Sequence, residues 1–418
     1  MTNPRELALK AIYDIEFKGA YSNMALKKYL KSADNRDKSL VTALVYGTVD
    51  RKITLDYVIG RLSKIKIKKI SKYILIILRM GIYQMMYMDK IPDSAAVNES
   101  VKLARRYGHG ASVGFVNGVL RSAAGFNIEY PNGKTEYLSV KYSFPMWLCE
   151  KWLSEFGFEF TEQLIDSFGK SAPLTLRANT LKITASELSD RLNSDGINAE
   201  VYDGAVVCDG FDIEHNELYR DGFFTVQDIA AQQAAKILNP ISGDMVIDMC
   251  AAPAGKTTHM AELMKNTGKI YAFDIYEHKI ELIKRNAERL GIKIIEPRLS
   301  DGETYDDKLC GTADKVLCDV PCSGLGIIRR KPEIKWNREQ NTDLPKIQRN
   351  ILNNAAKYLK IGGELLYSTC TIENEENGAV TGAFLKDNGN FEKLYEKTYY
   401  PHIDNTDGFY ICKMRRNK

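Results

Sequence analysis

Two cysteines stand at the ends of expected strands, each with polar neighbours. Cys322 lies in Asp319-Val320-Pro321-Cys322, at the end of the apolar run Lys315–Asp319, and Cys370 lies in Ser368-Thr369-Cys370-Thr371, after Gly363–Ser368. A free cysteine is most often a small core residue. Two of them at strand ends, beside an acid and several hydroxyl groups, instead indicate a reactive centre.

The chemistry that these residues could perform is nucleophilic addition to an aromatic ring. A thiolate is a potent nucleophile, and its addition to carbon 6 of a cytosine makes carbon 5 an enamine that can attack a sulfonium methyl group. Asp319 could hydrogen-bond the ring nitrogen and stabilise charge during the addition. The other thiol could then assist the elimination, and the residues alone do not say which of Cys322 and Cys370 attacks.

A loop of small residues separates an expected strand, Met245–Ile247, from an expected helix, Lys256–Met264. Small side chains let a ligand approach the backbone, and a helix N-terminus offers unpaired N–H groups. Asp274 ends the next apolar run, Ile270–Phe273, where its carboxylate can accept hydrogen bonds from both hydroxyls of a ribose. The candidate ligand contacts in the loop are Cys250, Ala251, Ala252, Pro253, Ala254, Gly255 and Lys256.

Three ligand classes compete for this loop. A P-loop needs glycine five residues before Gly255, where this chain has Cys250, and a dinucleotide fingerprint needs G-x-G-x-x-G, which is absent. S-adenosylmethionine (SAM) needs the small-residue loop and the ribose carboxylate without a phosphate cradle. SAM therefore fits best, with an ordinary strand–turn–helix connection as the alternative.

The elements that must position these residues alternate between strand and helix from Met245 onward. Further strands are expected at Ile292–Ile295, Lys315–Asp319 and Gly363–Ser368, and further helices at Lys279–Leu290 and Lys346–Leu359. This alternation predicts an α/β domain with a doubly wound, mostly parallel sheet. Ligands bind beyond the carboxyl ends of such strands, and Asp301 follows the third of them.

The chain before this domain has a different character. Residues 4–125 show apolar residues at helical spacing and are expected to be all-helical. Residues 126–140 contain Asn, Gly and Pro and indicate a linker. Residues 141–230 are expected to form a small α+β domain, with a helix at Tyr142–Phe156 and a strand at Leu174–Asn179. Residues 231–418 then form the catalytic domain.

Composition limits the class of protein. The 418 residues are 44% hydrophobic and 27% charged, with no N-terminal signal pattern and no apolar run of eighteen residues, which predicts a cytoplasmic protein without a membrane partner. The eight cysteines form no C-x-x-C pair, so no metal site is expected. Residues 1–125 hold 22 Lys and Arg against 10 Asp and Glu. This basic segment favours a polyanion partner, although a solvated surface explains the charge equally well.

The N-terminal segment resembles the NusB family of RNA-binding antitermination factors. The similarity lies in Arg5-x-x-Ala8, Asp50-Arg51, Leu78–Gln84 and Phe115–Arg121. The motifs Cys250–Lys256, Asp319–Gly324 and Ser368–Thr371 are similar to those of the Sun-type, nucleolar-protein family of RNA cytosine-5 methyltransferases. Together the two resemblances cover nearly the whole chain.

The resemblance implies a SAM-like (Rossmann-like) methyltransferase fold and a role for each motif. Cys370 matches the nucleophile, Cys322 the cysteine that helps release the product, and Asp319 the acid that contacts the base. Residues 250–256, Asp274, Asp301 and Asp319 match the SAM contacts. The family loop usually has Gly where this chain has Ala254, so a slightly altered cofactor affinity is expected.

The resemblance also implies a substrate. It predicts a monomeric enzyme that methylates small-subunit (16S) ribosomal RNA, in a single-stranded or loop form because a stacked cytosine is inaccessible. The alternatives are methylation of transfer RNA by the same chemistry and a non-catalytic RNA-binding factor. The intact Asp319, Cys322 and Cys370 disfavour the second alternative.

Overall fold

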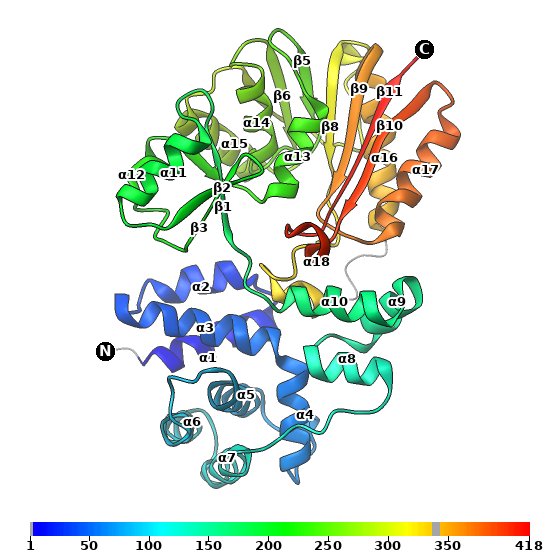
Figure 1. Ribbon diagram of the computed structural model, residues 1–418. Helices are drawn as coiled ribbons and strands as arrows, with labels where there is room; N and C mark the ends of the chain where they lie inside the picture. The colour runs from blue at the N-terminus through cyan, green and yellow to red at the C-terminus, as the bar shows by residue number, and fades with distance from the viewer. Residues whose placement is uncertain (1–2, 337–342) are drawn as a thin grey trace. The chain divides into compact units, whose positions relative to one another are not determined.

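The computed structural model describes residues 3–336 and 343–418, and the chain forms two compact units (Figure 1). Of the described residues, one unit contains 3–170 together with 328–336, and the other contains 171–327 and 343–418. We call them the helical unit and the catalytic unit.

The helical unit is built around α5, which is apolar on nearly all sides. Residues 74–78 of α5 are all buried, as expected for a helix that other helices surround. The prediction that residues 4–125 are all-helical is confirmed. The helices are α1 (Pro4–Lys18), α2 (Ser22–Leu30), α3 (Lys38–Asp50), α4 (Lys52–Leu62), α5 (Lys72–Tyr87), α6 (Asp93–Tyr107), α7 (Gly110–Ala123), α8 (Lys134–Tyr142), α9 (Met146–Phe156) and α10 (Phe158–Phe168). None of the helices in residues 3–336 and 343–418 could span a membrane.

Two features of residues 126–170 differ from expectation. Helix α8 starts at Lys134, inside the expected linker, because its apolar side chain Leu138 is fully buried. The helix expected at Tyr142–Phe156 begins only at Met146: Ser143 takes a left-handed conformation with φ of 60°, and Pro145 precedes the helix. A proline is favoured at a helix start but cannot lie inside one without breaking it.

A segment from far along the chain belongs to the helical unit. Glu333 accepts hydrogen bonds from the backbone N–H (3.0 Å) and hydroxyl (2.8 Å) of Ser22. Lys335 is fully buried, and its Nζ pairs with Asp50 at 2.7 Å. The indole N–H of Trp336 donates to the carbonyl of Val49 at 3.0 Å. Residues 328–336 were expected in the catalytic domain, and their buried polar contacts explain why they pack with the helices instead.

The catalytic unit begins with a small antiparallel sheet in the order β2-β3-β1-β4, with α11 packed on it. Helix α11 starts with a capping box between Thr184 and Glu187. The elements are β1 (Leu174–Ala178), α11 (Ala185–Ser194), β2 (Ala199–Tyr202), β3 (Ala205–Cys208), α12 (Glu217–Arg220) and β4 (Phe224–Val226). The expected mixture of helix and strand is therefore present in this part of the chain.

The large sheet has seven strands in the order β10-β11-β9-β8-β5-β6-β7 (Figure 1). The five strands from β9 to β7 are parallel, and β11 runs antiparallel to both of its neighbours, β9 and β10, so the predicted mostly parallel sheet is confirmed. The strands are β5 (Met245–Asp248), β6 (Lys269–Asp274), β7 (Ile295–Leu299), β8 (Ala313–Asp319), β9 (Leu359–Thr369), β10 (Phe391–Tyr399) and β11 (Phe409–Arg416). The helices are α13 (Ile229–Leu238), α14 (Gly255–Leu263), α15 (Glu277–Leu290), α16 (Leu344–Tyr358), α17 (Gly378–Asp387) and α18 (Pro401–Asp404).

Helices cover both faces of this sheet, as the apolar strands require. Val246 packs with α13, α14 and α15, whereas the next residue, Ile247, packs with α16 and α17. Successive strand residues point to opposite faces, so a strand buried on both faces must be continuously apolar. The sheet is thereby doubly wound, as predicted.

One predicted strand is displaced. The structure has β7 at Ile295–Leu299 and not at Ile292–Ile295, so the strand contains Pro297. A proline cannot donate to a neighbouring strand, and it is tolerated here because β7 is the edge strand next to β6. The apolar residues Ile292 and Ile294 pack under α15 instead, in the loop before the strand.

Candidate functional site

The parallel strands bring the polar residues at their carboxyl ends together. Asp248 at the end of β5 is in register with Leu317 of β8 and Ala272 of β6. Asp319 at the end of β8 is in register with Ser368 near the end of β9. The acid of the Pro-Cys motif and the Thr-Cys motif therefore start from adjacent positions.

The loop after β5 makes a sharp turn into α14. Ala254 has a φ of 79°, the left-handed conformation that favours glycine, and its carbonyl accepts from the backbone N–H of Thr258 at 2.9 Å. The Ala254 side chain is buried in a small apolar cluster with Ala251, Ala272 and Ile283. This contact offsets part of the strain that a methyl group adds at this position.

A cavity of about 230 Å³ opens between this loop, the end of β8 and the start of α13. Asp248 is its most buried acid, at 1% exposure, and accepts from the Thr257 hydroxyl at 2.7 Å. Burial raises the pKa of Asp248 to about 7, and the nearby Asp319 adds to this rise. The lining residues are Gln227, Asp228, Ala231, Asp248, Cys250, Ala251, Ala252, Pro253, Gly255, Lys256 and Asp319.

Asp274 and Asp301 differ in their surroundings. Asp274 is 5% exposed and accepts from the backbone N–H of Tyr276 at 3.2 Å, with Lys279 Nζ at 3.5 Å. After burial, the charge of Asp274 is one of the causes that raise the pKa of the Cys250 thiol in the loop. Asp301 is exposed, and its carboxylate accepts from the backbone N–H of Glu303 at 2.9 Å within its own turn. Neither residue lines the cavity, but Asp274 has the burial expected of a ribose acceptor.

These residues fit SAM. The loop presents only small side chains from Cys250 to Gly255, and Asp274 supplies a buried carboxylate beside it. The cavity lining also holds three acids, Asp228, Asp248 and Asp319, against a single cation, Lys256, so it suits a ligand with hydroxyl and amino groups better than a phosphate.

Lys256 joins the cofactor loop to the acid of the Pro-Cys motif. Its Nζ lies 2.7 Å from one oxygen of Asp319, whose other oxygen accepts from the Ser368 hydroxyl at 2.8 Å. Burial alone would lower the pKa of Lys256, but its ion pair with Asp319 outweighs burial and raises that pKa above its usual value. Lys256 also interacts electrostatically with Cys370. A buried ammonium group therefore faces both the acid and one of the two thiols.

The two cysteines of the motifs meet. Their sulfur atoms are 3.0 Å apart, and the backbone N–H of Cys370 donates to the sulfur of Cys322 at 3.3 Å. The hydrogen bond with Cys370 and burial raise the pKa of the Cys322 thiol well above its usual value. Either thiol could donate in this contact, and the raised pKa of Cys322 favours Cys322 as the donor.

An acid near the Pro-Cys motif also acts on Cys322. Glu376, which is 5% exposed, accepts from the backbone N–H of Ser323 at 2.9 Å and from the side chain of Gln348 at 2.8 Å. Its negative charge raises the pKa of Cys322 further. The charge of Lys256 therefore acts on Cys370, and the charge of Glu376 acts on Cys322.

Several contributors were not foreseen from the sequence. Gln227 and Asp228 line the cavity although they precede the first strand of the sheet. In the sequence, their position before helix α13 predicts only a helix cap. Asp228 does cap this helix, because it accepts from the backbone N–H of Ala230 at 2.9 Å. Glu376 lies in the acidic run Glu373–Glu376, which a sequence pattern cannot distinguish from a solvated loop.

Three segments of the chain match known families. Residues 235–415 match the family described as 16S rRNA methyltransferase RsmB/F, residues 2–125 match the NusB family, and residues 144–214 match the ferredoxin-like domain of RsmF/B-like methyltransferases. The matches follow one another along the chain and together cover most of it.

Curated relatives match over the whole length. The probable ribosomal RNA small subunit methyltransferase B of Bacillus subtilis (strain 168) is 38% identical over 99% of both chains. The protein of the same name from Synechocystis is 33% identical over 100% of both. Among solved structures, that of PH0851 has a TM-score of 0.84 and 27% identity, covering 100% of this chain and 99% of its own. A methyltransferase homologue from Pyrococcus horikoshii gives a TM-score of 0.59 at 29% identity, covering 67% of this chain and 97% of its own.

Proposed function

Because the chain belongs to the 16S rRNA methyltransferase RsmB/F family, we propose that it methylates carbon 5 of a cytosine in small-subunit ribosomal RNA through a covalent cysteine adduct. The enzyme is a SAM-dependent RNA methyltransferase, and SAM supplies an electrophilic methyl group when bound. The observation that carries the finer proposal is the cluster of Lys256, Asp319, Cys322 and Cys370 at adjacent strand ends.

Cys370 is the attacking residue in this proposal. Its sulfur forms a bond to carbon 6 of the cytosine, and the electron pair of the 5,6 double bond moves to carbon 5, which takes the methyl group. Lys256 and the thiol of Cys322 both stabilise negative charge on the Cys370 sulfur before the attack. The Glu376 charge beside Cys322 opposes the reverse arrangement.

The second half of the reaction removes the enzyme from the base. Solvent water takes the proton from carbon 5, and the electron pair of that C–H bond re-forms the 5,6 double bond. The bond between carbon 6 and sulfur breaks, and its electron pair returns to the Cys370 sulfur. Cys322 assists this elimination, because its sulfur lies 3.0 Å from the leaving thiolate and can exchange a proton there. Asp319, held by Lys256 and Ser368, accepts a hydrogen bond from the ring nitrogen when that nitrogen is protonated during the addition.

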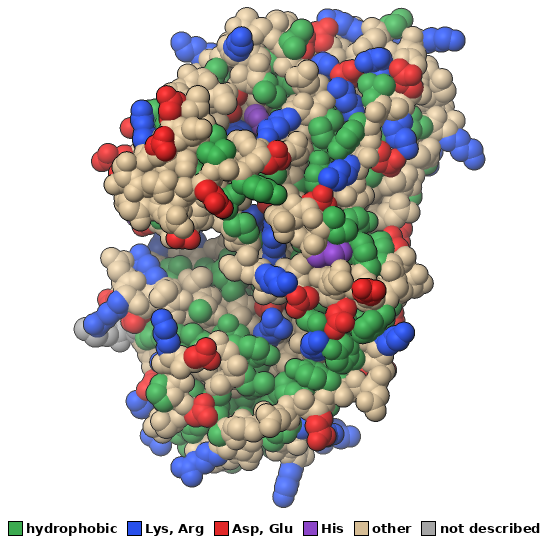
Figure 2. All heavy atoms as spheres, viewed as in Figure 1, with side chains coloured by type: hydrophobic (Ala, Val, Ile, Leu, Met, Phe, Trp, Pro, Cys, Tyr) green, Lys and Arg blue, Asp and Glu red, His purple; other side chains and the backbone are tan. Residues whose placement is uncertain are grey.

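The cofactor and RNA contacts complete the proposal. The residues proposed to hold SAM are Cys250, Ala251, Ala252, Pro253, Ala254, Gly255, Lys256, Asp274, Asp301 and Asp319. Residues 1–125 supply an RNA-binding domain, with residues 141–230 between it and the catalytic domain. The basic run Lys64, Lys66, Lys68, Lys69 and Lys72 is exposed between α4 and α5, and Figure 2 shows Lys and Arg side chains projecting from the surface. We further propose that the enzyme is a cytoplasmic monomer that needs no metal.

Bisulfite sequencing of ribosomal RNA tests the proposal. One cytosine of the small-subunit RNA should resist conversion in the parent strain, convert in a strain that lacks the gene, and resist again when the wild-type gene is restored. The Cys370→Ala gene should not restore resistance. An unchanged ribosomal RNA with a newly converting cytosine in a transfer RNA would establish the transfer RNA alternative instead.

A further inference from the structure

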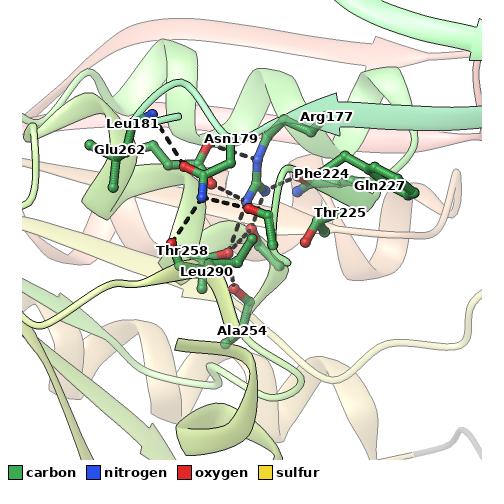
Figure 3. Close-up of polar contacts among 12 residues, drawn as sticks. Arg177, Asn179, Leu181, Phe224, Thr225, Gln227, Ala254, Thr258, Glu262 and Leu290 are labelled. Atoms are coloured by element: carbon green, nitrogen blue, oxygen red, sulfur yellow. Dashed lines mark hydrogen bonds and ion pairs between the residues drawn. The ribbon is translucent and has the colours of Figure 1, made fainter. Parts of the chain in front are cut away.

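A buried arginine of the small sheet contacts the start of the helix that follows the cofactor loop (Figure 3). Arg177 lies on β1 and is 3% exposed. Its Nη2 donates to the hydroxyl of Thr258 at 2.9 Å, and its Nη1 donates to the carbonyl of Gly255 at 2.5 Å. The same guanidinium forms a two-pronged ion pair with Glu262 at 2.8 and 3.1 Å, and it also contacts Gln227.

These contacts lead directly into the cofactor loop. Gly255 is the first residue of α14, and the Thr258 hydroxyl also donates to the carbonyl of Ala254 at 2.8 Å. Ala254 is the residue with the strained left-handed backbone. Arg177 is therefore linked through the Thr258 hydroxyl to the point where the loop turns, and it also holds the carbonyl of Gly255 at the end of the loop.

The planar guanidinium is suited to this task. It offers five N–H donors in a fixed geometry, and here it meets a carboxylate, a hydroxyl, a backbone carbonyl and a side-chain amide at once. A lysine in its place would keep the charge opposite Glu262 but could not hold the same set of acceptors. Because the pair is buried, each contact restricts the position of α14 more than a surface pair would.

We propose that Arg177 is a positioning residue of the SAM site, so that the small sheet forms part of the cofactor site. This inference rests on the proposed function, since it assumes that residues 250–256 bind SAM. Arg177 fixes the first turn of α14 and the left-handed turn at Ala254, and thereby preorganises the loop for the ligand.

The alternative is an ion pair that only stabilises the fold, and a nearby buried residue offers a matched control. Asn179 lies two residues after Arg177, directly beyond the end of β1 at Ala178. It is fully buried and donates to the carbonyls of Gly222 and Leu290, both at 2.9 Å (Figure 3). These contacts hold the small sheet in place without touching the cofactor loop.

Calorimetric titration of the full-length protein with SAM separates the two explanations. Arg177→Lys should raise the Kd for SAM about tenfold, the effect of one lost hydrogen bond to a charged group, and should raise KM for SAM but not for RNA. Asn179→Ala should lower the Tm about as much as Arg177→Lys does. It should leave the Kd for SAM within about twofold of the wild type, as expected of a purely structural contact.

A second variant covers the case in which Arg177→Lys does not fold. Thr258→Val keeps the shape of the side chain and removes its hydroxyl from the link between Arg177 and Ala254, so it should also weaken SAM binding. Wild-type affinity in Arg177→Lys, or in Thr258→Val where only that variant folds, would overturn the positioning role. A wild-type protein that binds no SAM would instead refute the proposed function.

Discussion

Removing the carboxylate of Asp274 should weaken SAM binding and leave the fold intact. Asp274 ends β6 beside the cofactor loop and is 5% exposed before any ligand binds, so little of its desolvation cost falls on the binding step. A hydrogen bond to a charged group contributes about 1.5–3 kcal/mol. Asp274→Ala should therefore raise the Kd for SAM about 10- to 150-fold.

Isothermal titration calorimetry measures this change directly. Asp274→Asn keeps an acceptor for the backbone N–H of Tyr276 and should give an intermediate loss. Lys279→Ala is the control, because it removes only the half-exposed lysine that lies 3.5 Å from Asp274, a contact worth at most about 1 kcal/mol. An Asp274→Ala protein that binds SAM as tightly as the wild type would remove Asp274 from the site.

Three further predictions concern stability and RNA binding. Lys335→Ala should destabilise the helical unit by about 3 kcal/mol in urea unfolding, because it truncates a fully buried side chain and removes the 2.7 Å partner of the partly exposed Asp50 carboxylate; an unchanged midpoint would show that neither contributes. Burial raises the pKa of Asp248 to about 7, so the native state holds a proton that the unfolded chain has lost above pH 4, and stability falls as the pH rises through this window. Asp248→Asn should remove this fall, so the difference in stability between the variant and the wild type should shift in favour of the variant from pH 5 to pH 8. Parallel profiles of stability against pH for the two proteins would contradict the burial of an ionisable group. Deleting residues 1–125 should flatten the salt dependence of RNA affinity without changing SAM affinity, and an equal salt slope would mean that the basic surface is only solvated.

Local patterns predicted the central strands of the catalytic domain because these strands are buried on both faces. The runs ending at Asp248, Asp274 and Asp319 are continuously apolar, and only a parallel sheet covered by helices on both faces buries such strands. The pattern failed at β7, where the strand is at the edge and has intermediate burial, so its residues carry little periodicity. Pro297 inside β7 also made a strand at Ile295–Leu299 hard to predict, because proline is disfavoured within strands.

Long-range contacts could not be predicted from one sequence. Nothing local marks residues 328–336 as part of the helical unit, since the assignment rests on contacts of Glu333 and Lys335 with residues about 300 positions earlier. The contact of Arg177 with Glu262 spans 85 positions for the same reason. The motif residues Asp319 and Cys370 were nevertheless predicted to meet, because neighbouring parallel strands place their carboxyl ends together.

The order of the two cysteines could not be predicted from their motifs alone. Each thiol follows a strand and has hydroxyl neighbours, so the two motifs do not show which cysteine is the nucleophile. The difference lies in their surroundings, which place Lys256 near Cys370 and Glu376 near Cys322. These neighbours come from α14 and from the loop before α17, and only the fold brings them to the two sulfurs.

Trapping of the covalent adduct tests the central claim most directly. Each variant is incubated with SAM and unmodified small-subunit ribosomal RNA, and the protein is analysed by denaturing electrophoresis. Cys322→Ala should attack and methylate but release product poorly, so a protein–RNA adduct should accumulate, and it should be absent both from Cys370→Ala and from the double variant. An adduct that accumulates in Cys370→Ala and not in Cys322→Ala would contradict the account and make Cys322 the nucleophile.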